Sequence, residues 1–216
     1  MRSARRSIRQ EDFNPTFQFE HEYSFPVAGV DEAGIGSWIG PVMAGAVILE
    51  DGVSQDLLSM LHDSKKLSEK KREQIFDLLY KNPFVHIGVG EASLEEIVTL
   101  NIRNAGLLAM KRAVMALPLR PKAILVDGTG RPDFEGEVKL IVKGDQRSYS
   151  IAAASIIAKV TRDRWIKKLA EEYPDYGWDT NAGYGTKQHQ EALHSLGVTP
   201  WHRVTYAPVA ALLEVG

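Results

Sequence analysis

Three apolar segments of the chain each end in acidic residues. Asp31 and Glu32 follow the first segment directly, Asp127 follows the second, and Asp145 comes shortly after the third. In open α/β sheets, functional sites form at strand ends, where several loops meet on a rigid scaffold. Carboxylates gathered there would repel one another unless a cation neutralised them. Oxygen ligands suit Mg²⁺ or Mn²⁺, and two such ions can activate water and stabilise the leaving oxygen of a phosphodiester.

The same acids also have an ordinary structural interpretation. Acidic residues after strands are common in turns, and Asp127 followed by Gly128 is by itself a turn signal. Neighbours in a strand point to opposite faces, so Asp31 and Glu32 can share one ion only if the strand twists or ends between them. The spacing of the four acids therefore leaves both interpretations open.

A glycine-rich segment, 34–40, follows the first acidic pair. Its spacing is one residue away from a dinucleotide-binding fingerprint, no capped helix follows it, and the acids before it would oppose a pyrophosphate. A nucleotide-binding loop is therefore disfavoured, whereas glycine leaves room for a sugar–phosphate chain to approach the backbone. Tyr184, which lies between two glycines, is either a platform for a sugar or base or simply packed.

Ser155, Lys159 and Asp163 share one face of a predicted helix at i,i+4 steps. This spacing predicts either an ordinary ion pair between Lys159 and Asp163 or a lysine near a backbone phosphate. Lys159 belongs to a stretch, 139–168, that holds eight Lys or Arg against two Asp in a chain of formal net charge −2. Such a local excess indicates a basic patch. The six histidines show no metal-binding spacing.

Length and composition limit what these candidates can belong to. The chain has 216 residues, 44% of them hydrophobic and 25% charged, which is typical of one globular domain with or without a small appendage. The absence of cysteine excludes disulfides, thiolate nucleophiles, iron–sulfur clusters and cysteine-built zinc sites. The sequence shows neither a membrane-spanning stretch nor the apolar core of a secretory signal, so we expect a soluble protein that is not exported. The absence of cysteine fits the cytoplasm, and a monomer is the plain expectation. Four arginines in the first ten residues predict a solvated basic arm, with a transit peptide as the alternative.

Alternating strands and helices must position the candidate residues. The apolar patterns predict strands at 25–30, 42–49, 84–89, 123–126 and 138–142, and helices from 93, at 68–80, 105–116, 150–172 and near 187–196. We therefore expect an α/β fold with a mixed central sheet flanked by helices. Residues 1–24 show no period and are expected to form a flexible arm, 25–173 the domain that holds the candidate catalytic acids, and 174–216 a helical C-terminal extension packed on the same core.

In order along the chain, these segments resemble bacterial ribonuclease HII. The matching motifs are Val30-Asp-Glu-Ala-Gly34, Gly40-Pro-Val42, Asp63-Ser-Lys-Lys-Leu-Ser68, Val126-Asp-Gly128, Lys143-Gly-Asp145, residues 150–163, Gly183-Tyr-Gly-Thr-Lys187 and His202-Arg203. They span roughly residues 27–209, and this many ordered motifs are far more specific than any single one.

The resemblance implies the ribonuclease H-like fold and hydrolysis on the 5′ side of a ribonucleotide, either paired to DNA in an RNA/DNA hybrid or embedded in duplex DNA. It implies 3′-hydroxyl and 5′-phosphate ends, and two divalent ions, Mg²⁺ or Mn²⁺, held by Asp31, Glu32, Asp127 and Asp145. The expected substrate-binding residues are Gly34, Ile35, Gly36, Lys65, Ser155, Lys159 and Tyr184. Among these, the glycine loop and Tyr184 are expected to sense the 2′-hydroxyl, which separates RNA from DNA.

The sequence departs from the family pattern at Ile35, where the family loop reads Gly-Arg-Gly. Isoleucine cannot make the charge-assisted phosphate contact of arginine. We therefore expect cleavage of RNA/DNA hybrids with a weakened preference for a single embedded ribonucleotide. The alternatives are a non-catalytic protein that binds hybrid duplexes with a steep salt dependence, and a related nuclease that acts on DNA alone.

Overall fold

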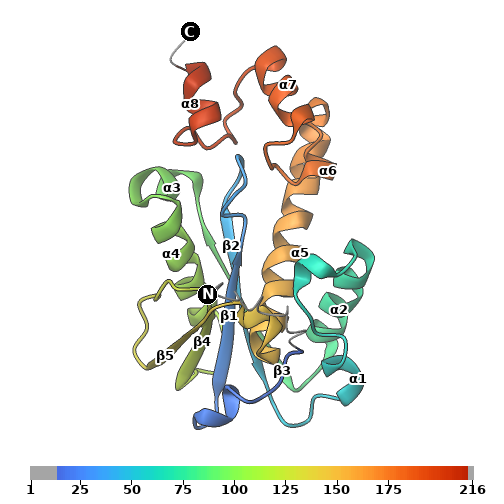
Figure 1. The fold of residues 1–216 in the computed structure, drawn as a ribbon, viewed down its shortest axis with the longest axis vertical. Coiled ribbons are helices and arrows are strands. Elements are labelled where there is room, and N and C mark those ends of the chain that lie inside the picture. The colour runs from blue at the N-terminus through green and yellow to red at the C-terminus, as the bar shows by residue number, and fades with distance from the viewer. Residues whose placement is uncertain (1–13, 214–216) are drawn as a thin grey trace, which may run out of the picture.

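The computed structural model describes residues 14–213, which build one mixed sheet (Figure 1). Its strands are β1 (Val27–Ala33), β2 (Val42–Leu49), β3 (Val85–Ala92), β4 (Ala123–Asp127) and β5 (Glu137–Ile141), in the spatial order β3-β2-β1-β4-β5. The first three strands are antiparallel neighbours, whereas β4 pairs in parallel with both β1 and β5. The expected α/β fold with a mixed central sheet is confirmed.

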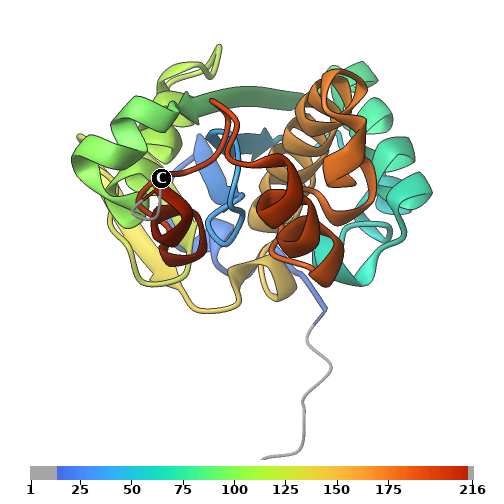
Figure 2. The same cartoon turned by 90° about the horizontal axis from the view of Figure 1, so that it is seen from above.

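Helices cover both faces of this sheet. On one side lie α3 (Leu94–Leu100) and α4 (Ile102–Met115), and on the other lie α1 (Gln55–Leu58), α2 (Glu69–Lys81) and α5 (Tyr149–Glu172) (Figure 1, Figure 2). Because both faces are covered, β2 is buried along its whole length and its sequence is continuously apolar. One hydrophobic cluster lies between the sheet and α4 and another between the sheet and α5, so the core has two layers.

Helix α5 approaches the sheet closely because small residues meet along the contact. The alanines at 152–154 are buried, and a Cβ added at Gly45 of β2 would lie only 2.5 Å from the carbonyl oxygen of Ala154. The Ser148 side chain caps the first turn of α5, and the helix ends before Pro174, which cannot continue it. Neither α5 nor any other helix within residues 14–213 is both long and apolar enough to cross a lipid bilayer.

The C-terminal part is helical and packs on the far end of α5. Its elements are η4 (Pro174–Tyr176), α6 (Trp178–Asn181), α7 (Lys187–Leu196) and α8 (Ala207–Leu213). Tyr176 and Trp178 are buried against Ile166 and Leu169 of α5. This part lies above the sheet in Figure 1, and the Gly40 N–H donates to the Trp201 carbonyl, which ties it to the loop between β1 and β2. The expected helical C-terminal addition is confirmed.

Residues 14–24 differ from the expected flexible arm. They include the short 3-10 helix η1 (Glu20–Glu22), and Glu20 is buried. The Glu20 carboxylate accepts hydrogen bonds from two serines at the start of α5, Ser148 and Ser150. The expectation is wrong for this segment. A single side chain, Glu20, holds it against α5, and such a contact leaves no periodic pattern in the sequence. The rest of the expected arm, 1–13, lies outside the described residues.

Candidate active site

The parallel strands β1, β4 and β5 bring the four candidate acids to one edge of the sheet. Asp31 and Glu32 lie near the end of β1, Asp127 is the last residue of β4, and Asp145 lies in the 3-10 helix η3 (Gly144–Gln146) after β5. The register of the two parallel pairs sets these strand ends side by side. The Gly144 N–H donates a 2.6 Å hydrogen bond to the Asp127 carboxylate, which ties the end of β4 to η3.

Asp31 and Glu32 are neighbours in one strand, yet both carboxyl groups interact with the charge of Asp127. Strand β1 does not end between them but continues to Ala33. Asp31 is buried, and its carboxylate accepts a 2.7 Å hydrogen bond from the Glu32 N–H. Burial raises the pKa of both carboxyl groups, and the negative charge of Asp127 raises each pKa further. Both acids therefore lie within the electrostatic field of Asp127.

Burial and mutual repulsion perturb most of this acidic cluster. Burial, followed by the charges of Glu32 and Asp127, raises the pKa of Asp31 well above its usual range. The pKa of Glu32 rises to about 7 and that of Asp145 to about 6, in both cases chiefly through burial. Such groups keep their negative charge at neutral pH most readily when positive charge is near. The cluster therefore attracts cations.

The donor chemistry of the cluster fits a hard divalent cation, because every candidate ligand is a carboxylate oxygen. Within residues 14–213, no three acidic or histidine side chains converge closely enough to hold an ion as they stand. The carboxylates interact through their charges, and their side chains would have to turn toward an ion to coordinate it. The structure thus contains an acidic, cation-attracting cluster rather than a finished coordination shell.

Lys65 supplies positive charge to the same cluster. It lies in the 3-10 turn η2 (Ser64–Lys66), where the Asp63 side chain accepts a 2.9 Å hydrogen bond from the Lys65 N–H. Burial alone would lower the pKa of Lys65, but nearby carboxylates, Asp31 and Asp145 foremost, raise it overall. The structure therefore places this predicted substrate-binding residue beside the acids.

Asp63 and Ser155 lie next to the four acids. Asp63 is buried, accepts a hydrogen bond from the Gln146 side chain, and raises the pKa of Asp145 further after the main effect of burial. The sequence singles out Asp63 only through its place in the motif that contains Lys65. The Ser155 hydroxyl hydrogen-bonds to Asp31, an interaction that lowers the pKa of Asp31, so the predicted placement of Ser155 near the substrate site is consistent with its position.

Two buried arginines hold the glycine segment 34–40. Gly34 has a φ of 101°, and a Cβ added there would lie 2.1 Å from Nε of Arg162, so a side chain has neither a suitable backbone nor space. The Arg203 guanidinium donates to the carbonyl oxygens of Gly34, at 2.6 Å, and Ser37, at 2.7 Å. The only sequence signal for these arginines is their place in the matching motifs.

Ile35 and Tyr184 contact different neighbours of the glycine segment. The Cδ1 atom of Ile35 would lie 3.0 Å from a Cβ added at Gly106 of α4, and Ile35 lines a cavity of about 410 Å³ together with Glu32 and Asp127. Tyr184 is 41% exposed, and its ring lies 3.4 Å from the position of a Cβ at Gly36. The structure therefore brings Ile35 to the acids and Tyr184 to the glycine segment.

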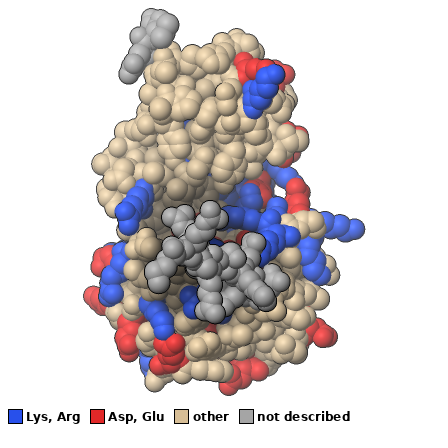
Figure 3. Space-filling model, in the orientation of Figure 1, with Lys and Arg blue, Asp and Glu red and all other residues tan. Residues whose placement is uncertain are grey.

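Lys159 is paired with another residue of its own helix. Its ammonium lies 2.6 Å from the Asp163 carboxylate, which is the ordinary ion pair that its spacing predicts. Within the stretch 139–168, Arg162 is buried, and Lys139, Arg164 and Lys167 form ion pairs with acidic side chains of neighbouring elements, so the expected basic patch stays a prediction. On the face in Figure 3, charged side chains gather over the lower half, and the C-terminal helices expose few. Arg164 and Lys167 of α5 both pair with acidic side chains of α2.

The protein has the ribonuclease H-like fold, which is defined by a mixed sheet in this strand order with helices on both faces. Its acids lie near the ends of β1 and β4 and after β5. The family model described as ribonuclease HII matches residues 28–209. The chain belongs to the ribonuclease HII family, as its motifs predict. It is therefore a ribonuclease H, a divalent-metal-dependent endonuclease that acts on RNA/DNA hybrids.

Individual relatives agree with this assignment. The ribonuclease HII of Pelagibacter ubique is 48% identical over 188 residues, which cover 87% of this chain and 98% of that protein. That of a Jannaschia species is 48% identical over 200 residues, covering 92% of this chain and 98% of the relative. The crystal structure of ribonuclease H2 from Pyrococcus horikoshii has a TM-score of 0.74 at 28% identity, covering 88% of this chain and 97% of that chain. Bst-RNase HIII in complex with Mn²⁺ shares the fold, with a TM-score of 0.69 at 19% identity over 88% of this chain and 69% of its own.

Proposed function

We propose that this chain cleaves the phosphodiester on the 5′ side of ribonucleotides, in RNA/DNA hybrids and embedded in duplex DNA, leaving 3′-hydroxyl and 5′-phosphate ends. The observation that carries the proposal is the gathering of Asp31, Glu32, Asp127 and Asp145 at one sheet edge. Burial and repulsion raise the pKa of three of these acids, which is the electrostatic state expected of a site built to receive cations.

The four carboxylates are the proposed ligands of two divalent ions, Mg²⁺ or Mn²⁺. When bound, such ions supply an activated water and stabilise the charge on the leaving oxygen. The part of the chain itself is to gather anionic oxygens in a partly buried site. Lys65, beside the same acids, is the proposed partner of a substrate backbone phosphate.

The glycine segment and Tyr184 are the proposed sensors of the ribonucleotide. Hydrogen bonds from Arg203 fix the backbone of this segment, and its glycines leave room for a sugar to approach. The 2′-hydroxyl is both a donor and an acceptor, so fixed backbone groups can distinguish it from the hydrogen of DNA. The exposed ring of Tyr184 beside Gly36 offers a face on which the sugar or base can pack.

The test uses a labelled DNA duplex with one ribonucleotide, a matched RNA/DNA hybrid and an all-DNA duplex of the same sequence, each incubated with Mg²⁺ or Mn²⁺. Asp127→Asn is the control, because asparagine keeps an oxygen that can accept from the Gly144 N–H but removes the charge. We expect the wild-type chain to cleave the hybrid to 5′-phosphate products. The variant should lose about 100-fold or more in rate, since it removes a proposed ligand from both ions.

Each outcome of this experiment assigns a different function. Cleavage of both duplexes would show that sensing of a single ribonucleotide survives with isoleucine at position 35. Cleavage of the hybrid alone would keep the nuclease and attribute the weakened preference to Ile35. Binding without cleavage in either metal would overturn the proposal and leave a protein that binds hybrids, whereas equal cleavage of an all-DNA duplex would indicate a DNA nuclease.

A further inference from the structure

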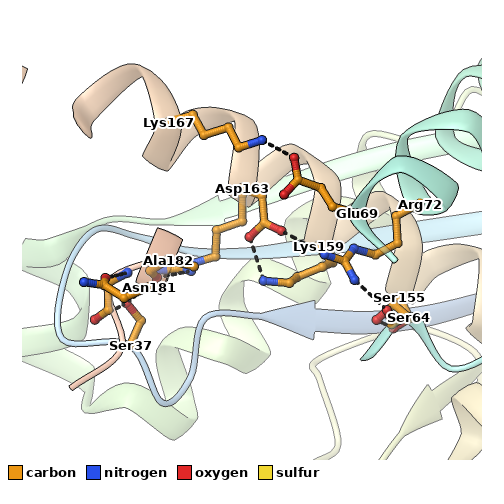
Figure 4. A network of polar contacts seen from close by, with 12 residues as sticks. Ser37, Ser64, Glu69, Arg72, Ser155, Lys159, Asp163, Lys167, Asn181 and Ala182 are labelled. Atoms are coloured by element: carbon orange, nitrogen blue, oxygen red, sulfur yellow. Dashed lines mark hydrogen bonds and ion pairs between the residues drawn. The ribbon is translucent and has the colours of Figure 1, made fainter. Parts of the chain in front are cut away.

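Arg72, near the start of α2, holds the turn that carries Lys65. Its Nη1 atom donates to the carbonyl oxygens of Ser64, at 3.0 Å, and Leu67, at 2.6 Å, so the two contacts bracket the lysine. Its Nη2 atom forms an ion pair of 3.8 Å with Asp163 of α5. Figure 4 shows the two side chains facing each other. Both are mostly buried, with exposures of 13% and 14%. Arg72 therefore connects α2, the turn η2 and helix α5.

The turn itself meets α5 a second time. The hydroxyl groups of Ser64 and Ser155 are 2.8 Å apart and share a hydrogen bond (Figure 4). The Ser155 hydroxyl also hydrogen-bonds to Asp31, so a line of contacts runs from the turn to the acidic cluster. The position of η2 against α5 therefore sets where Lys65 stands relative to the acids.

A three-residue turn needs such external support. Within η2, the Lys66 N–H donates to the Asp63 carbonyl, and the Lys65 N–H donates to the Asp63 side chain. These local bonds shape the turn but do not fix it to the rest of the molecule. A lysine side chain has several flexible bonds, so its charge stays at one place only when its backbone is fixed. A guanidinium that donates to two carbonyls at once supplies that constraint.

We propose that Arg72 is a positioning residue, which fixes the turn Ser64–Lys66 against α5 and so places the Lys65 ammonium for a phosphate of the substrate. This inference rests on the proposed function, in which Lys65 binds the substrate backbone. Arg72 acts through Lys65 and does not itself contact the nucleic acid, because its Nη atoms are engaged by the turn and by Asp163.

The test is a double-mutant cycle on the binding of an RNA/DNA hybrid. The variants are Arg72→Gln, Lys65→Met and the double variant, and the measurements are KM, kcat and the salt dependence of the hybrid Kd. We expect each single variant to raise KM and Kd by about tenfold, the size of one charge-assisted hydrogen bond. The double variant should be no weaker than Lys65→Met alone, because Arg72 has nothing left to position. In all three variants the salt slope should fall by the equivalent of about one phosphate.

Arg164→Gln is the matched control. Arg164 also joins α5 to α2, through ion pairs with Glu73 and Asp77, but it does not contact the turn. We expect its KM and salt slope to remain those of the wild type. Two outcomes would overturn the proposal: additive increases of Kd in the double variant, or a salt slope of the double variant that falls by the equivalent of a second phosphate. In either case Arg72 would bind the substrate directly.

A measurement without metal or substrate separates this proposal from the proposed function. Hydrogen–deuterium exchange of the peptide covering 63–68 should be faster in Arg72→Gln than in the wild type and unchanged in Arg164→Gln. Asp163→Asn, which keeps both carbonyl contacts, should give a smaller increase of the same kind. Unchanged exchange in Arg72→Gln would overturn the positioning role even in an active enzyme. A wild-type chain that does not cleave hybrids would instead refute the proposed function.

Discussion

Ile35 is the residue from which we expect an effect on the choice of substrate. It lies beside Glu32 and Asp127 in the cavity that reaches α4, so it lines the approach to two of the four acids. An apolar side chain there contributes surface but no charge toward a phosphate. The neighbouring Gly34 carries a different constraint, because its backbone lies against the guanidinium of Arg162.

Replacing Ile35 by arginine is expected to raise the rate on a duplex with one ribonucleotide by about tenfold, because a guanidinium adds one charge-assisted phosphate contact. The rate on a uniform RNA/DNA hybrid should change little, since every register of that substrate can be cleaved. The measurement is the ratio of kcat/KM for the two substrates. Ile35→Leu, which stays apolar, is the control, and an unchanged ratio in Ile35→Arg would refute this role.

Gly34→Ala and Gly197→Ala form a matched pair for the cost of a side chain at positive φ. Gly34 has a φ of 101° and Gly197 a φ of 87°, but a Cβ at Gly197 meets nothing within 4 Å whereas one at Gly34 collides with Arg162. We expect a loss of about 1–2 kcal/mol in the free energy of unfolding for Gly197→Ala. Gly34→Ala should lose about 1–3 kcal/mol more through overpacking. Urea titration measures both, and equal losses would contradict the steric argument.

At the scale of elements, strong apolar patterns predict the sheet and most helices to within a few residues. The helix predicted at 105–116 begins earlier, at Ile102, because the Asn101 side chain caps it by accepting from the N–H groups of Arg103 and Asn104. Residues 14–24 could not be predicted in the same way. Their docking depends on contacts with residues more than a hundred positions away. The local spacing of apolar residues carries no information about such contacts.

Glu20→Ala is expected to lower the free energy of unfolding by about 1–3 kcal/mol, because it leaves buried donors of Ser148 and Ser150 without their acceptor. Glu22→Ala is the matched control two residues further on. Glu22 forms a more exposed ion pair with Lys139, and such pairs contribute about 0–1 kcal/mol. Thermal or urea unfolding compares the two variants. Similar losses would show that Glu20 does not anchor the N-terminal segment to α5.

At the scale of the whole molecule, the acids of the site are predictable and its supporting residues are not. Asp31 and Glu32 lie near the end of β1, Asp127 ends β4, and Asp145 follows β5, so local apolar patterns are enough to single out all four. Arg203, in contrast, acts on a carbonyl 169 positions earlier in the chain, and a fully buried arginine contradicts the usual preference of arginine for the surface. Only the assembled fold shows that the C-terminal part holds the glycine segment.

The packing of this C-terminal part predicts sensitivity to acid. The Trp178 indole N–H donates to His189, and the Thr199 N–H donates to Nδ1 of His202, so both rings are held neutral. Burial lowers the pKa of both histidines, that of His202 to about 4. Below the ordinary histidine range near pH 6.5, the unfolded chain therefore binds more protons than the folded chain. Each such histidine stabilises the folded chain fully above pH 6.5. As the pH drops from 6.5 toward 4, the free energy of unfolding should fall by up to about 1.4 kcal/mol per pH unit for one such histidine.

His202→Asn tests this acid sensitivity, because the asparagine oxygen can still accept from the Thr199 N–H but does not titrate. We expect a lower stability at pH 7.5 and a shallower decline between pH 6.5 and about 5 than in the wild type. Comparing slopes removes the contribution of the carboxylates, which both proteins share. His194→Asn, at an exposed position of α7, should keep the wild-type slope. Parallel declines in wild type and His202→Asn would contradict the prediction.

Helix α5 connects the sheet to the C-terminal part of the molecule. It runs without a break through 24 residues, about 36 Å, from the turn that bears Asp145 to the aromatic cluster of the C-terminal part. Ser155, in the second turn of α5, acts on Asp31, and Arg162, in the middle of the helix, lies against Gly34. One continuous helix thus supports both the acidic cluster and the glycine segment, so a bend in α5 between residues 155 and 162 would shift the two relative to each other.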